Sequence, residues 1–209
     1  MQSFAHTPEL RRRFQADLDR FPRLEATAAG LTPAAVVSLI VGGVDGEAAL
    51  VLTRRTSGLR NHGGQWALPG GRVEPGETAI RTALRELREE VGIEVSSENV
   101  LGALDDFGTR SGFRITPLVV WGPREVTLAP NPREVAAAYL VPLRALHSLS
   151  PRIVDGPDPE RPLLTLPLES PATVVYAPTA ALIFQMREVL LHGRATRVDR
   201  YGEPRFAWR

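Results

Sequence analysis

The segment from residue 71 to residue 93, GRVEPGETAIRTALRELREEVGI, constrains the chain more than any other. It opens with a glycine-rich loop and continues with apolar residues spaced three and four apart. This spacing predicts an amphipathic helix whose apolar stripe faces a core. Thr78 is suited to cap the start of the helix, and Gly92 is suited to end it. The predicted stripe consists of Ile80, Ala83, Leu84, Leu87 and Val91.

Three glutamates lie together on this predicted helix. Glu86, Glu89 and Glu90 are spaced i, i+3 and i+4, so their carboxylates converge on the side away from the apolar stripe. A solvated helix face tolerates the repulsion between these three negative charges, whereas a divalent cation bound among them would relieve it. Mg²⁺ prefers hard oxygen ligands and keeps waters or substrate phosphates in its shell. The preceding Gly70 and Gly71 let the backbone approach the same place and contribute a carbonyl or an amide.

The complete pattern of this segment distinguishes a metal site from a merely solvated helix face. It fits GX5EX7REUXEEXGU, with U aliphatic, at every fixed position, and the chain therefore resembles the Nudix hydrolases. The resemblance implies an α/β fold, specifically an α/β/α sandwich with a mixed sheet in which this box forms a loop-helix-loop. It also implies Mg²⁺- or Mn²⁺-dependent hydrolysis of a nucleoside diphosphate linked to another group. The matching residues are Gly71, Glu77, Arg85, Glu86, Leu87, Glu89, Glu90, Gly92 and Ile93.

By position, the resemblance assigns Glu86, Glu89 and Glu90 as metal ligands, together with a backbone group of Gly70. The remaining box positions are expected to be structural. Glu77 would form an ion pair with the box arginine that braces the loop on the helix, with contact to the metal as its alternative role. The structural residues are Gly71, Glu77, Arg85 and Gly92.

The polar loop before the box carries a second resemblance. Residues 51–71 are similar to LLTxR[SA]x3Rx3Gx3FPGG, the signature of the coenzyme A pyrophosphatase branch of the Nudix family. Arg55 and Arg60 would then bind substrate phosphates bidentately, the alternative being surface arginines on a loop. The matches are Leu52, Thr53, Arg55, Arg60, Gly64, Pro69, Gly70 and Gly71, and the departures are Val51, Thr56 and Leu68.

The resemblance to this branch continues beyond the box. Residues 104–117, LDDFGTRSGFRITP, are similar to its pattern LDD.PT.SGF..TP. Phe113 in this segment is a candidate to stack on adenine or to pack under pantetheine, and its alternative role is in the core. Further on, Glu134 is either an extra metal ligand, a general base for water, or an exposed charge at the entry to a strand.

The rest of the chain predicts one Nudix hydrolase domain over residues 1–209. An N-terminal helix and linker occupy 1–33, the core 34–149, and a proline-rich excursion, closing helix and tail 150–209. The tail is expected either on the domain or across a dimer partner. Helices are predicted at 8–21, just after Pro142 and at 179–191, and strands at 34–41, 48–53, 100–106, 115–121, 135–141 and 163–168.

Composition bounds the function classes. The net charge of +1 leaves no electrostatic footprint for nucleic acid, and the absence of cysteine excludes disulfides and thiolate metal sites. No apolar run is long enough to span a membrane, and the N-terminus lacks the apolar region of a secretory signal. We therefore expect a cytoplasmic protein whose partner is a small nucleotide conjugate. The resemblance adds the expectation of a homodimer.

The leading functional prediction is hydrolysis of coenzyme A or acyl-coenzyme A to 3′,5′-ADP and 4′-phosphopantetheine or its acyl form. The catalytic residues are expected among Glu86, Glu89 and Glu134, with Glu89 or Glu134 accepting the proton of the attacking water. Two alternatives stay open: a Nudix pyrophosphatase acting on ADP-ribose, NADH or dinucleotides, and a non-catalytic module that senses a nucleotide.

Overall fold

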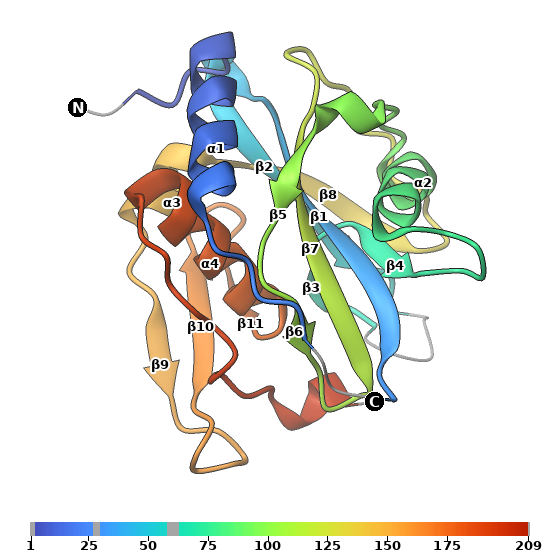
Figure 1. Ribbon diagram of the computed structural model, residues 1–209, viewed down its shortest axis with the longest axis vertical. Helices are drawn as coiled ribbons and strands as arrows, with labels where there is room; N and C mark the ends of the chain where they lie inside the picture. The colour runs from blue at the N-terminus through green and yellow to red at the C-terminus, as the bar shows by residue number, and fades with distance from the viewer. Residues whose placement is uncertain (1–2, 27–29, 58–62, 209) are drawn as a thin grey trace.

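The computed structural model describes residues 3–26, 30–57 and 63–208, and its main element is a mixed sheet built around β1 (Thr32–Gly42). β1 pairs in parallel with β7 (Phe113–Trp121) and antiparallel with β2 (Ala48–Arg55) (Figure 1). The strand order is β3-β2-β1-β7-β5, while β4 also pairs with β1, β6 with β7, and β8 with β2. The shorter strands and β8 are β3 (Trp66–Ala67), β4 (Gly70–Arg72), β5 (Val100–Ala103), β6 (Phe107–Gly108) and β8 (Val135–Pro142).

Helices cover both faces of this sheet. α2 (Ala79–Val91) lies on one face, and α1 (Pro8–Arg20) and α4 (Thr179–His192) lie on the other (Figure 1). Successive residues of a strand point to opposite faces, so Leu39 of β1 packs in the cluster under α2 and Ile40 in the cluster under α1 and α4. Burial on both faces explains the continuous apolar run of β1 and confirms the predicted α/β/α sandwich.

The box helix begins and ends where the sequence predicts. The Thr78 hydroxyl oxygen accepts a hydrogen bond from the Arg81 N–H at 3.2 Å, and Gly92 ends the helix with φ 71°. The prediction that Ile80 faces the core is wrong, because its side chain is 38% exposed. Thr82 takes the buried position of the first turns, where its hydroxyl donates to Glu77. Of the remaining stripe, Ala83, Leu87 and Val91 are buried and Leu84 is partly buried.

The proline-rich excursion contains more structure than the one strand predicted there. β10 (Leu163–Leu168) is the centre of an antiparallel three-stranded sheet, flanked by β9 (Arg152–Val154) and β11 (Thr173–Tyr176). All three residues of β9 are exposed, so this short edge strand has no apolar pattern from which to predict it. The remaining helices are α3 (Leu143–Ser148) and the 3₁₀ turns η1 (Val44–Gly46), η2 (Ser97–Asn99) and η3 (Arg205–Trp208).

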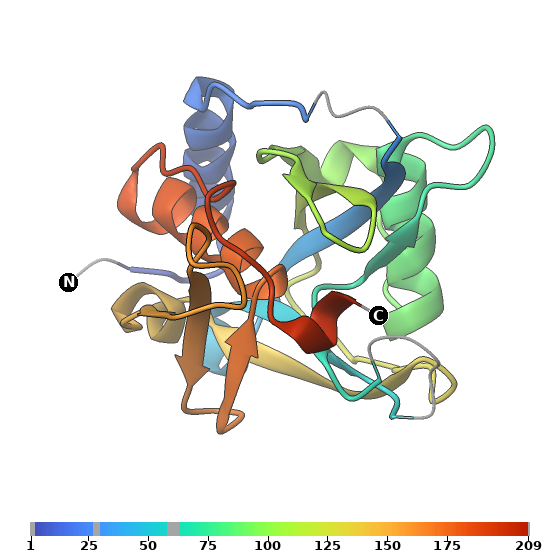
Figure 2. The same ribbon diagram turned by 90° about the horizontal axis from the view of Figure 1, so that it is seen from below.

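The C-terminal segment after α4 packs against its own chain. Figure 2 shows it running between the three-stranded sheet and the end of the main sheet. Gly202 forms a bridge with Leu163 of β10, and the Gln65 side chain donates a hydrogen bond to the Phe206 carbonyl at 3.1 Å. This placement brings the tail to the edge of the cavity described below. Among the described residues, no helix is both long and apolar enough to cross a bilayer.

Candidate active site

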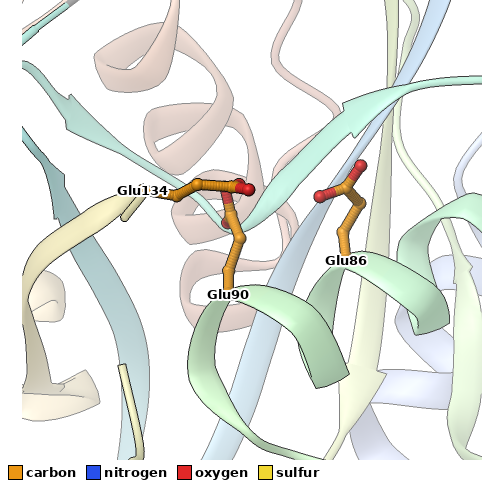
Figure 3. A group of neighbouring side chains, drawn as sticks. All are labelled: Glu86, Glu90 and Glu134. Atoms are coloured by element: carbon orange, nitrogen blue, oxygen red, sulfur yellow. The ribbon is translucent and has the colours of Figure 1, made fainter. Parts of the chain in front are cut away.

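Three carboxylates from two elements converge beside the sheet (Figure 3). Glu86 and Glu90 stand one turn apart on α2, and Glu134 comes from the turn just before β8. One oxygen from each carboxylate lies within 4.8 Å of the others. We refer to Glu86, Glu90 and Glu134 as the carboxylate cluster.

Backbone hydrogen bonds hold the turn of Glu134 against the C-terminal end of α2. The Asn131 N–H donates to the Glu90 carbonyl at 3.0 Å, and the Glu134 N–H donates to the Asn131 carbonyl at 3.0 Å. Directly after β2, the Thr56 N–H donates to the Glu134 carbonyl at 2.9 Å. The turn is therefore fixed from both sides, which places its glutamate opposite the two on the helix.

Two glycines of β4 bring backbone against the carboxylate cluster. Gly70 has φ 151°, and a Cβ there would lie 2.2 Å from the Ala35 carbonyl oxygen, so only glycine fits. Its N–H donates to Glu90 Oε2 at 3.1 Å. A Cβ on Gly71 would lie 2.2 Å from Glu86 Oε1. Glycine at residue 70 thus lets β4 approach β1 and direct an N–H to Glu90, and glycine at residue 71 leaves room for the Glu86 carboxylate.

The electrostatics of the carboxylate cluster disfavour its charged form. Burial, together with the charges of Glu86 and Glu134, raises the pKa of Glu90 to about 7 against the opposing effects of the Gly70 N–H and Arg55. Burial likewise raises the pKa of Glu86. A bound divalent cation would reverse this balance, and carboxylate oxygens are the hard donors that Mg²⁺ and Mn²⁺ prefer. The residues present therefore fit such a cation.

Arg85 ties the loop of the box to the helix. Its Nε and Nη2 donate to the two carboxylate oxygens of Glu77 at 3.0 and 3.1 Å, and this pairing, with the Thr82 hydroxyl, lowers the pKa of Glu77 to about 2. Its Nη1 donates to Glu86 at 2.9 Å and to Glu89 at 3.0 Å. One guanidinium thus orients a loop residue and one carboxylate of the cluster at the same time.

A cavity of about 350 Å³ adjoins the carboxylate cluster. Arg55, Gly70 and Gly71 border both, and Arg55 Nη1 lies 3.5 Å from Glu90 Oε1. Within the cavity, the Arg72 guanidinium lies over the Phe113 ring at 5.0 Å from its centroid. Apolar residues of the sheet and α4 line much of the remainder, among them Val36, Leu68, Ile115 and Leu182.

The arrangement of the carboxylate cluster agrees with the family that sequence comparison identifies. A model of the NUDIX domain matches residues 32–162, which is more than half of the chain. The chain belongs to the Nudix family. Within that family, this Nudix chain is 46% identical over 98 residues to an uncharacterized Nudix hydrolase NudL of Yersinia enterocolitica, covering 46% of this chain and 50% of that protein. It is 44% identical over 105 residues to a NudL of Yersinia pestis, covering 50% and 53%. The chain thus spans about half the length of these curated relatives.

Solved Nudix structures share the fold at low sequence identity. The Nudix hydrolase RenU of M. smegmatis has a TM-score of 0.50 and 22% identity, covering 81% of this chain and 92% of that one. The Ap4A hydrolase of C. elegans has a TM-score of 0.50 and 14% identity, covering 77% and 99%. At these identities the likeness supports the Nudix fold and says nothing of the substrate.

The structure brings together a different set of glutamates from the one that the box predicts. Glu86 and Glu90 belong to the carboxylate cluster, but Glu89 does not: its side chain is 45% exposed and it pairs with Arg85. Its place in the cluster is taken by Glu134, which the sequence left open between a site residue and an exposed charge. The roles of Glu89 and Glu134 in this Nudix chain remain predictions.

The structure describes two of the three predicted substrate-binding residues. Arg55 and Phe113 line the cavity, and Phe113 is half-buried. Arg60 lies outside the described residues. Sequence reasoning missed Arg72, although it directly follows the glycine that opens the Nudix box. It also missed Glu203, which lines the cavity from a tail that shares no motif with the box.

Proposed function

We propose that this chain hydrolyses the pyrophosphate bond of a nucleoside diphosphate conjugate with the help of a divalent cation, and that the substrate is coenzyme A or an acyl-coenzyme A. The observation that carries the proposal is the carboxylate cluster beside a cavity that Arg55 and Arg72 line. Cations and guanidinium groups together suit a diphosphate, since charge gathers on its oxygens in the transition state. The products would be 3′,5′-ADP and 4′-phosphopantetheine or its acyl form.

Glu86, Glu90 and Glu134 would hold the cation, with Glu89 and the Gly70 backbone as further candidates. When bound, a divalent cation neutralises the diphosphate and lowers the pKa of a coordinated water. Arg55 and Arg72 would bind the phosphate oxygens, and Arg60 would add to them by position in the signature. Either Glu89 or Glu134 accepts the proton of the attacking water.

The substrate assignment depends on sequence similarity. The signature of the coenzyme A pyrophosphatase branch covers both Arg55 and the two glycines at the carboxylate cluster, and a second similar segment includes Phe113. A half-buried ring beside a guanidinium suits a flat base, so the cavity also has the character needed for ADP-ribose, NADH or a dinucleotide. A sensing module that does not hydrolyse is the less favoured alternative, because the glutamates of the Nudix box are all present.

A product assay tests the proposal. Purified protein with Mg²⁺ or Mn²⁺ is offered coenzyme A, acetyl-coenzyme A, ADP-ribose, NADH and diadenosine polyphosphates, and the products are separated by chromatography. We expect 3′,5′-ADP and 4′-phosphopantetheine or its acetyl form from coenzyme A and acetyl-coenzyme A, faster than nucleotides are released from ADP-ribose, NADH or the diadenosine polyphosphates. Faster turnover of ADP-ribose or NADH would overturn the coenzyme A assignment, and tight binding without products would favour the sensing module.

The setting of this activity is part of the proposal. We place the enzyme in the cytoplasm, acting on a small molecule and bound to neither nucleic acid nor membrane, and we propose a homodimer on the basis of the family resemblance. Sedimentation of the purified protein tests the dimer, because a mass near that of a single 22.8 kDa chain would contradict it.

A further inference from the structure

The cavity contains one carboxylate that the proposed chemistry does not use. Glu203 belongs to the C-terminal segment, beyond the part of the chain that the NUDIX model matches, and only 4% of its surface is exposed. It lines the cavity together with Phe113 and Arg72. Its Oε1 accepts a hydrogen bond from the Arg110 N–H at 2.8 Å. Its Oε2 is buried and has no hydrogen-bond partner among residues 3–26, 30–57 and 63–208.

Several contacts fix the position of this side chain. The Trp208 indole donates to the Glu203 carbonyl at 3.1 Å, and the Arg110 guanidinium lies over the Trp208 ring at 5.1 Å. One residue earlier, the Gly202 N–H donates to the Pro162 carbonyl at 3.0 Å. The tail is therefore attached to the Arg110 loop and to the second sheet. These bonds hold one oxygen of the carboxylate against Arg110 and leave the other without a donor, in a residue that lines the cavity.

A buried carboxylate oxygen without a donor is unfavourable. Burial raises the pKa of Glu203, and the Arg110 N–H and the charges of Arg161 and Arg110 only partly oppose this effect. Leaving a buried acceptor unpaired costs more than a typical hydrogen bond contributes. A ligand that fills the cavity can supply the missing donor, because Glu203 is one of the residues that line it.

The other lining residues indicate what kind of ligand carries that donor. The Phe113 ring under Arg72 and the apolar side chains around it suit a flat aromatic ring. A flat ring with an N–H donor on its edge is a nucleobase. When position 6 of a purine faces Glu203 Oε2, adenine presents the N–H of its amino group there, whereas hypoxanthine presents a carbonyl oxygen, which a carboxylate oxygen repels.

We propose that Glu203 Oε2 accepts a hydrogen bond from the 6-amino group of the substrate's base, so that the C-terminal segment makes the cavity selective for adenine over hypoxanthine. The inference rests on the proposed function only in that the nucleoside half of the substrate occupies this cavity. Glu203 is thus a specificity-determining residue, separate from the carboxylate cluster.

One substitution tests the hydrogen bond to Glu203 Oε2 with little change in the shape of the side chain. In Glu203→Gln, the Arg110 N–H still requires an acceptor, so the amide oxygen takes the place of Oε1 and the NH₂ group takes the place of Oε2. The substitution therefore converts an acceptor into a donor at nearly constant shape. Such a donor suits the carbonyl of a 6-oxopurine and mismatches the amino group of adenine. Glu169→Gln, on an exposed turn of the same C-terminal region, is the matched control.

Calorimetric binding of ADP and IDP tests the proposal without any hydrolysis. We expect the wild-type protein and Glu169→Gln to bind ADP about tenfold or more tightly than IDP, and Glu203→Gln to lose or reverse this preference. Equal affinity of the wild-type protein for ADP and IDP would overturn the proposal, whether or not the variant folds. An unchanged preference in a folded Glu203→Gln protein would do the same.

The binding of 4′-phosphopantetheine separates the two halves of the substrate. If Glu203→Gln weakens its binding and leaves the affinities for ADP and IDP unchanged, the pantetheine half occupies the cavity and the proposal is overturned. Failure of the product assay with a retained preference for ADP would instead refute the hydrolytic function and leave the role of Glu203 in place.

Discussion

The N–H of Gly70 donates a hydrogen bond to Glu90 Oε2 at 3.1 Å, which joins the glycine loop of the Nudix box to the most buried carboxylate of its helix. This bond is possible because nothing but glycine fits at residue 70, where a Cβ would meet the backbone of β1. The box therefore acts as one unit, in which the loop sets where the helix glutamates lie.

Gly71→Ala tests how closely the loop and the glutamates fit. The added Cβ would lie 2.2 Å from Glu86 Oε1, so the carboxylate must move away from the cluster. We expect turnover to fall at least about tenfold with little loss of thermal stability, since a side chain can move more easily than backbone. Gly108→Ala is the control, because its nearest contact to an added Cβ is 3.6 Å. Wild-type turnover of Gly71→Ala would contradict the placement of Glu86.

The stability of the metal-free protein should depend on pH through Glu90. Its pKa is raised from 4.5 to about 7 in the folded protein, so the folded state binds more protons than the unfolded state between these values. The contribution is fully present below pH 4.5 and is lost as the pH rises through 7. We expect the free energy of unfolding in chelator to fall by on the order of 3 kcal/mol across this window.

Thermal melts across this pH range, with and without Mg²⁺, measure the effect of Glu90. Glu90→Gln removes one titrating group and should reduce the dependence in chelator to the part that Glu86 contributes. Added Mg²⁺ should restore stability to the wild-type protein near pH 7 and should do much less for the variant. A pH dependence in chelator that is the same in both proteins would show that Glu90 does not cause it.

Arg85→Lys tests the bracing of the loop. An ammonium group cannot pair with both oxygens of Glu77 and also reach Glu86, as the guanidinium does. We expect kcat to fall by roughly tenfold to a hundredfold, because Glu86 loses its orientation. Arg81→Lys, on the exposed side of the same helix, should keep wild-type kcat. Equal kcat values for the two variants would count against an orienting role of Arg85.

Glu134→Gln tests whether the cation has a ligand outside the Nudix box. Its oxygen lies within 4.8 Å of oxygens of Glu86 and Glu90, so we expect the variant to bind Mn²⁺ at least about tenfold more weakly. Electron paramagnetic resonance of free Mn²⁺ measures this affinity directly. Glu125→Gln, an exposed residue of the preceding loop, serves as the control. If Glu89→Gln weakens Mn²⁺ binding and Glu134→Gln does not, the ligand set is the one that the box predicts.

Much of the fold and two of the three members of the carboxylate cluster can be predicted from the sequence. The box helix, its cap at Thr78 and the converging pair of Glu86 and Glu90 depend on spacing within one segment, which local periodicity reports. Ile80 was the exception on that helix, because the hydroxyl of Thr82 makes a buried hydrogen bond that hydrophobicity alone does not predict.

The remaining site residues come from contacts between distant parts of the chain. Glu134 reaches the carboxylate cluster through backbone bonds between its turn and the end of α2, and Glu203 reaches the cavity through a tail attached to Arg110. Neither position has a periodic pattern around it. The edge strand β9 escaped prediction for a related reason, since its exposed residues carry no signal of burial.

The most direct test of the account is the hydrolysis of coenzyme A by the wild-type protein and by Glu90→Gln at saturating Mg²⁺, with products separated by chromatography. The account predicts equal amounts of 3′,5′-ADP and 4′-phosphopantetheine from the wild-type protein, no products after chelation, and a rate at least about a hundredfold lower in the variant. Products formed in chelator, or at the wild-type rate by Glu90→Gln, would contradict the claim that the carboxylate cluster holds the cation for this reaction.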